Sequence, residues 1–200
     1  ALPISALTTS LSGIHCTEIM FANLAYDDAT TEDMLSEEKM KALHQYSTAH
    51  CLVTLTIGGN DMLKIFKAIP ANNVKALTSA TQEVHTRYLQ LLKLIKATVP
   101  ASTILLTTIY DPTDGTGILP TTTMGTGTLP VTFIEQFNSF VESCAKRQRA
   151  TLADVYSHFR GHGAECGRKD NFWYSPSQPV EPSYRGASEI RRVWLDALGF

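Results

Sequence analysis

Two uninterrupted apolar runs of strand length constrain the fold of this chain more than any other feature. Residues 51–57 read CLVTLTI and residues 102–110 read STILLTTIY. A strand with one solvated face alternates apolar and polar residues, whereas a strand covered on both faces is apolar throughout. Both runs therefore predict strands of a parallel sheet that is buried between two layers of helices.

Helical patterns and shorter strands alternate with these two runs along the chain. Apolar residues at helical spacing predict helices over residues 30–46, between Pro70 and Pro100, over 131–147 and over 183–200. Short strands are expected over residues 1–7, 21–25 and 151–156, and a long surface loop over the glycine- and proline-rich residues 111–130. The alternation predicts one domain, residues 1–200, with a three-layer α/β/α fold around a parallel sheet, similar to the flavodoxin-like folds.

Composition narrows the classes of function. The chain has 200 residues, a formal net charge of -2 and 44% apolar residues, which suits one hydrophobic core. This balance gives no sign of nucleic acid or a membrane surface as a partner, and no run is apolar enough to span a bilayer. The first residues, ALPISALTTSLSG, lack the basic start of a signal peptide, so a cytoplasmic and a mature secreted protein both stay open. The four cysteines form no C-x-x-C pair, and disulfides are possible without being implied.

The polar loop that follows the first buried run carries the clearest functional signal. Residues 58–61 read GGND, and functional loops of parallel sheets lie at the carboxyl ends of the strands. One interpretation is an ordinary turn, since glycine tolerates positive φ and Asn and Asp make local turn bonds. The other is that the glycines bring the backbone close to a ligand, while Asn60 donates a hydrogen bond into a cleft.

The segment VTLTIGGNDML, residues 53–63, resembles the third motif block of the SGNH (GDSL) hydrolases, a family of α/β serine esterases and lipases. The resemblance implies that Asn60 is an oxyanion-hole donor and that Gly59 helps to shape the loop. The family carries its nucleophilic serine in a first block, which ALTTSLSG matches in part and which places the nucleophile at Ser10. A rival frame, ALPIS, would place it at Ser5 but leaves hardly any strand before the serine.

Two further blocks resemble the family with changes at functional positions. NLAYDDATT, residues 23–31, puts Asp28 where the family has a glycine whose N–H helps to bind the oxyanion. Aspartate adopts the glycine-type conformation less readily, and its carboxylate would oppose an oxyanion. QPVEPSYRG, residues 178–186, puts Glu181 at the position of the histidine base and Gln178 at that of its aspartate. A carboxylate of ordinary pKa is a poor base for a serine hydroxyl at neutral pH.

A replacement base is sought among the histidines. His162 lies in the glycine loop FRGHG, and many members of the family have a similar F-x-G-H there. The hypothesis is a Ser10–His162–Glu181 triad, because a triad is defined by geometry and not by chain order. The competing interpretation is that His162 is a turn residue and that Glu181 pairs with Arg185.

The expected activity is hydrolysis of a carboxylic ester with a short acyl or acetyl group, a small-molecule partner, without cofactor or metal. Glycines interrupt the spacing of His158, His162 and Cys166 that a helical metal site would need. Asp111 and Asp114 are better explained by turn chemistry than by a calcium loop. The alternative function is a weak or inactive relative that binds an acyl or carbohydrate ligand. The substrate and the oligomeric state stay open.

Overall fold

The structure, a computed structural model, describes residues 8–13, 19–118, 129–166 and 171–200. Residues 8–13 are helical. The named elements are α2 (Thr31–Met34), α3 (Glu37–His44), β1 (Cys51–Leu55), α4 (Gly59–Ala68), α5 (Val74–Thr98), β2 (Ser102–Thr107), α6 (Val131–Gln148), β3 (Thr151–Ala153), α7 (Val155–Phe159) and α8 (Tyr184–Leu198). None of the helices in these ranges is long and apolar enough to cross a membrane.

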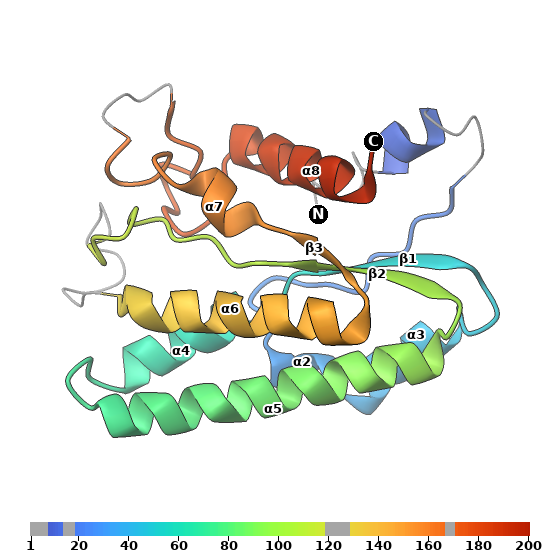
Figure 1. Ribbon diagram of the computed structural model, residues 1–200, viewed down its shortest axis with the longest axis horizontal. Coiled ribbons are helices and arrows are strands. Elements are labelled where there is room, and N and C mark those ends of the chain that lie inside the picture. The colour runs from blue at the N-terminus through green and yellow to red at the C-terminus, as the bar shows by residue number, and fades with distance from the viewer. Residues whose placement is uncertain (1–7, 14–18, 119–128, 167–170) are drawn as a thin grey trace.

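The described strands form one parallel sheet in the order β1-β2-β3. The register pairs Leu52 with Thr103 and Leu106 with Leu152. One face of the sheet is covered by α6, with α5 packed outside it, and the other face is covered by α7 and α8 (Figure 1). This arrangement confirms the expected three-layer α/β/α fold with a central parallel sheet.

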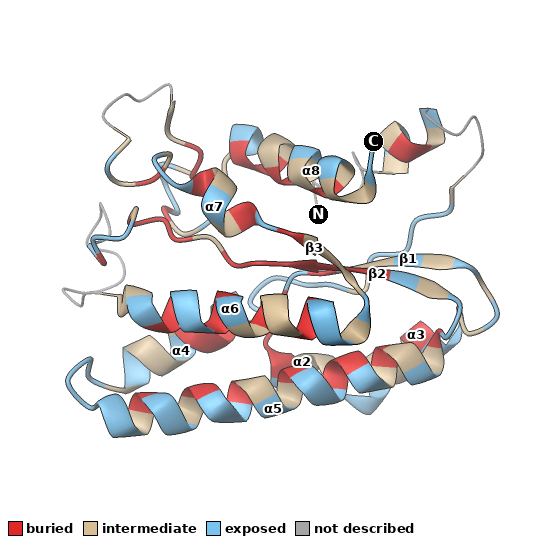
Figure 2. Ribbon diagram, viewed as in Figure 1, coloured by how far each residue is buried: buried red, intermediate tan, exposed pale blue. Residues whose placement is uncertain are grey.

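Side chains of β2 alternate between two apolar cores, one on each face of the sheet. Ile104 and Leu106 belong to the core shared with α5 and α6, and Leu105 belongs to the core under α7 and α8. Because successive residues of a strand point to opposite faces, a run that is apolar throughout serves both cores. Buried residues accordingly gather on the helix faces turned toward the sheet (Figure 2). A hydrogen bond from the Trp194 indole to the Thr107 hydroxyl, 3.0 Å long, ties α8 to the end of β2.

Two expected elements before β1 differ from the sequence prediction. The helix expected over residues 30–46 is broken into α2 and α3, because the Ser36 side chain accepts a hydrogen bond from the Lys39 N–H and starts a new helix. The strand expected over residues 21–25 is absent; the segment forms no ladder and exposes Phe21. An apolar run without a neighbouring strand has no partner for its backbone groups. The strand expected over residues 1–7 lies outside the described residues.

The segment after β2 is only partly the surface loop that was expected. Asp111, Pro112 and Thr113 are buried, and residues 119–128 lie outside the described ranges. The Asp111 carboxylate accepts hydrogen bonds from Thr113, through its N–H and its hydroxyl, and from the Gly115 N–H. These contacts satisfy the polar groups of the turn internally, which allows the segment to be buried. The strand expected over residues 151–156 ends at Ala153, because Asp154 caps α7.

Candidate functional site

The GGND loop joins β1 to α4 through a sharp turn at Gly58. Gly58 has a φ of 109° and precedes the first residue of α4, Gly59. A Cβ at residue 58 would lie 2.2 Å from Cζ of Phe137, whereas one at residue 59 would meet only Ile109, at 3.8 Å. Glycine is therefore required at residue 58 by both backbone conformation and space. The turn places Asn60 in the first turn of α4, where helix N–H groups favour negative charge.

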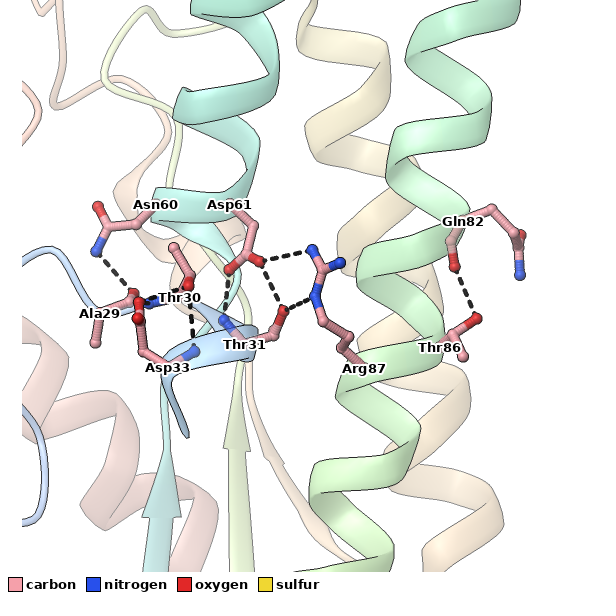
Figure 3. A network of polar contacts seen from close by, with 9 residues as sticks. All are labelled: Ala29, Thr30, Thr31, Asp33, Asn60, Asp61, Gln82, Thr86 and Arg87. Carbon is pink, nitrogen blue, oxygen red and sulfur yellow. Dashed lines mark hydrogen bonds and ion pairs between the residues drawn. The ribbon is translucent and has the colours of Figure 1, made fainter. Parts of the chain in front are cut away.

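Asp61 joins three segments that are distant in the sequence (Figure 3). Its carboxylate is buried and accepts hydrogen bonds from the Thr31 N–H, at 2.9 Å, and the Thr31 hydroxyl, at 2.6 Å. Arg87 of α5 lies 3.4 Å from the same carboxylate and also donates to the Thr31 hydroxyl. These bonds replace the local turn bonds that the sequence suggested. Asp61 therefore anchors the loop and leaves Asn60 as the polar side chain of GGND that reaches the cavity.

Asn60 is oriented by the segment that contains the second motif block. Its side-chain Nδ2 donates to the Ala29 carbonyl over 3.0 Å, as Figure 3 shows. One of the two amide hydrogens is used in this way, and the other is left for a ligand. Asp28, the residue before Ala29, has a φ of 62°. This left-handed conformation favours glycine, in agreement with the glycine that the family resemblance places there.

A cavity of about 180 Å³ lies at the carboxyl ends of β1 and β2. Its walls are mostly apolar, with Asn60, Gly59 and Glu181 among the polar contributions. It is lined by Ala29, Thr56, Ile57, Gly58, Gly59, Asn60, Met62, Leu63, Phe66, Ile109, Tyr110, Pro112, Leu129, Ile134, Val180 and Glu181. A second, wider recess is an open groove along the solvent-facing side of α5, lined by exposed residues between Lys75 and Thr86. The cavity at the strand ends is less open than this groove and is the better candidate for a ligand site.

The rim of the cavity is acidic. Desolvation raises the pKa of the Glu181 carboxyl, and the negative charges of Asp27 and Asp28 raise it further. Burial also raises the pKa of the Tyr110 hydroxyl, and the charge of Glu181 adds to this shift. Negative charges that repel one another in a partly desolvated site favour protonation of one carboxylate or binding of a cation beside them.

Sequence reasoning identified Glu181 but missed Asp27 and Tyr110 as its neighbours. The adjacent acidic pair in YDDATT was the available signal for Asp27. Tyr110 carried none beyond its place at the end of a buried run.

His162 lies in a hydrogen-bonded loop beside Trp173. Its ring stacks on the Trp173 indole with centroids 3.4 Å apart, and its Nδ1 lies 2.9 Å from the Asn171 carbonyl oxygen. Since a carbonyl only accepts, Nδ1 carries the hydrogen. The Asp114 carboxylate holds this loop by accepting hydrogen bonds from the N–H groups of Gly161, Gly163 and Glu165. These contacts do not bring His162 to Glu181, which lines the cavity.

Ser10 lies in the short helix formed by residues 8–13. In Figure 1 this helix, in dark blue, lies beside the C-terminal end of α8, and Leu11 packs in the same core as Ile190 and Trp194. The cavity lies beyond the other end of α8, where Glu181 precedes its first residue. A helix of 15 residues is about 22 Å long. The structure therefore brings Asn60, Gly59 and Glu181 together and places Ser10 and His162 elsewhere, and Ser5 lies outside the described residues.

The other sequence candidates for metal binding have structural roles. His158 pairs with Glu189 of α8, with Nε2 and the carboxylate oxygen 2.8 Å apart. Asp111 accepts N–H groups of its own turn, which is the turn chemistry expected for it. Asp114 instead accepts N–H groups of the distant loop that contains His162, so local turn chemistry does not describe its role. Across the described ranges, no three His, Cys, Asp or Glu side chains converge as a metal site requires.

The fold and the cavity define a class of protein: an α/β domain with a cavity at the carboxyl ends of parallel strands, beside a Gly-Gly-Asn-Asp turn. Residues 6–179 match the profile of the family described as GDSL-like lipase/acylhydrolase. The chain belongs to this family. The match ends before Glu181, so the alignment of the last block rests on the residues around Pro182 and Gly186 alone.

Solved structures show the same fold at low sequence identity. The lipase Lip_vut3 from a goat rumen metagenome is 16% identical with a TM-score of 0.72, over 98% of this chain and 86% of that one. Phospholipase A1 from Streptomyces albidoflavus is 19% identical with a TM-score of 0.64, over 96% and 84%. The extracellular lipase from Streptomyces rimosus is 20% identical with a TM-score of 0.59, also over 96% and 84%. No curated protein matches the sequence.

Proposed function

We propose that the protein hydrolyses carboxylic esters with a short acyl chain and that the acyl chain enters the cavity beside Asn60. The observation that carries this proposal is that the GGND loop lines a half-open, mostly apolar cavity. Its volume of about 180 Å³ is well below the roughly 300–1,000 Å³ of pockets that take drug-sized ligands. A short acyl group fits this size better than a long chain.

Asn60 is the proposed donor to the ester carbonyl oxygen. Its amide is already oriented by the bond to the Ala29 carbonyl, and such preorganised donors stabilise the charge that develops on the oxygen in the transition state. The N-terminal turn of α4 adds favourable potential at the same place. Ser10 stays the proposed nucleophile, and to act there the helix of residues 8–13 has to move from its place beside α8.

A second candidate function is binding of an acyl ligand without hydrolysis. Two observations favour it: Ser10 and His162 are held away from the cavity, and Glu181 occupies the position of the family's histidine. The same cavity and the same Asn60 donor would then hold the ligand, and no acyl-enzyme would form.

Hydrolysis of p-nitrophenyl acetate and butyrate separates the two functions. Wild type is compared with Ser10→Ala, Asn60→Ala and Ser139→Ala, the last changing a serine on the exposed side of α6. An esterase with Ser10 as nucleophile loses activity in Ser10→Ala and keeps it in Ser139→Ala. Removal of the Asn60 donor is expected to lower the rate about 10²–10³-fold.

Each other result also decides between the functions. Equal activity in wild type and Ser10→Ala, lowered by Asn60→Ala, would keep the esterase and exclude Ser10 as its nucleophile. Hydrolysis no faster than the uncatalysed reaction, together with binding of an acyl ketone in the cavity, would establish the second candidate.

A further inference from the structure

The cavity beside Asn60 combines an apolar interior with an acidic rim. Ile57, Met62 and Phe66 belong to the interior, and Glu181 stands at the rim as an exposed residue. Building on the proposed function, we propose that this site selects esters whose alcohol part carries an ammonium group, with the acyl chain in the cavity and the cation between Glu181 and Tyr110.

Tyr110 gives the rim a second group that attracts a cation. Its side chain lines the cavity together with Glu181. Its ring is held in place by Phe159, stacked at 5.3 Å between centroids, and by Tyr174, edge-on at 5.5 Å. An ammonium group is attracted by the face of an aromatic ring as well as by a carboxylate, and a ring held in advance loses little freedom on binding.

Asp27 and Asp28 extend the negative charge around this place. Both belong to the segment that Asn60 fixes through the Ala29 carbonyl, and their charges are felt at the Glu181 carboxyl. Ion pairs between described residues involve the carboxylates of Asp61, Glu142 and Glu189, and none involves Asp27, Asp28 or Glu181. The rim therefore presents negative charge that other parts of the described fold do not neutralise.

An apolar cavity with a negatively charged rim indicates which esters the site would favour. An anionic ester would meet repulsion at the rim, and a neutral one would gain nothing from it. An ester of an amino alcohol, with a cation two or three bonds beyond the ester oxygen, would place its charge at the rim while its carbonyl reaches Asn60. Long-range attraction to the same carboxylates would weaken as salt is added.

Two ketones test the proposal without turnover. One is the analogue of butyrylcholine in which CH₂ replaces the ester oxygen, and the other has a carbon in place of its quaternary nitrogen, so that the two have the same shape and differ in charge. Their dissociation constants are measured by isothermal titration calorimetry at pH 8 with wild type, Glu181→Gln and the control Glu142→Gln. Glu142 lies on α6 and pairs with the exposed Lys146.

The cationic ketone is expected to bind wild type and Glu142→Gln about fivefold more tightly than its neutral twin. The preference should vanish in Glu181→Gln and shrink at high salt. Equal binding of the two ketones to wild type, or a preference that survives in Glu181→Gln, would overturn the inference and leave the proposed function standing. Binding of neither ketone would remove the acyl site, and with it both proposals.

Discussion

Gly58 is the residue at which the site depends most directly on backbone geometry. Substitution by alanine puts a Cβ at a φ of 109° and 2.2 Å from Phe137, which is itself fully buried and cannot swing away. We expect Gly58→Ala to lower the free energy of unfolding by about 2–4 kcal/mol in urea titrations. Gly59→Ala is the matched control, because residue 59 is helical and open, and it should stay within about 1 kcal/mol of wild type. Equal effects of the two changes would contradict this account.

The Asp61 carboxylate is the second residue on which the loop depends. The two oxygens of the Asp61 carboxylate accept from the Thr31 N–H, the Thr31 hydroxyl and Arg87. In Asp61→Asn an NH₂ group, which cannot accept a hydrogen bond, takes the place of one of these oxygens. Since the site is buried, we expect a loss of about 2–3 kcal/mol in the free energy of unfolding. Asp196→Asn, at an exposed position of α8, should change it by less than about 0.5 kcal/mol. A similarly small effect at Asp61 would mean that the network contributes little to stability.

At the scale of elements, the sequence predicted helices correctly where apolar residues at helical spacing form the buried face of the helix. The helices over residues 131–147 and 183–200 are confirmed by α6 and α8, including Ser183 as the N-cap of α8. The strand over residues 21–25 failed because apolar character alone does not supply a neighbouring strand. The short β3 likewise shows that a cap, here at Asp154, outweighs β propensity.

The candidate site was predictable only in part, for a related reason. The end of a buried strand and a motif located Asn60 in advance. The partners of Asp61, however, lie 30 and 26 residues away, and no local pattern joins them. The positions of His162 and Ser10 depend on Trp173 and α8, which belong to tertiary packing and not to the segments that contain the two residues.

The N-cap of α8 tests how firmly this helix is placed over the sheet. The Ser183 hydroxyl accepts a hydrogen bond from the Gly186 N–H at 3.2 Å and donates one to the Trp173 carbonyl at 2.9 Å. Ser183→Ala removes both, and we expect the free energy of unfolding to fall by about 1–2 kcal/mol. Ser36→Ala at α3 removes a single exposed bond of 3.4 Å and should cost less than about 1 kcal/mol. The reverse order, seen in chemical denaturation, would count against the role of Ser183 as a link between α8 and Trp173.

At the scale of the whole molecule, folding brings together carboxylates that are about 150 positions apart in the chain. Asp27 and Asp28 precede the first strand of the described sheet and Glu181 precedes the last helix, yet the two aspartates raise the pKa of the Glu181 carboxyl. Such an arrangement opposes folding at neutral pH, since an unfolded chain would separate the charges. The acidic rim is therefore a cost in stability that a site for cations would explain.

The pH dependence of stability measures this cost. Partial desolvation, aided by the charges of Asp27 and Asp28, raises the folded-state pKa of Glu181, so the folded protein favours the protonated carboxyl more than the unfolded chain does. The resulting stabilisation is fully present below the unfolded pKa of about 4.3 and is lost as the pH rises through the folded pKa. Relative to wild type, Glu181→Gln should therefore gain stability between about pH 4 and pH 7 in urea titrations at low salt. Glu142→Gln, which lacks these neighbours, should show no such gain. A difference between wild type and Glu181→Gln that is constant over this range would mean that the rim carboxylates do not interact in the folded protein.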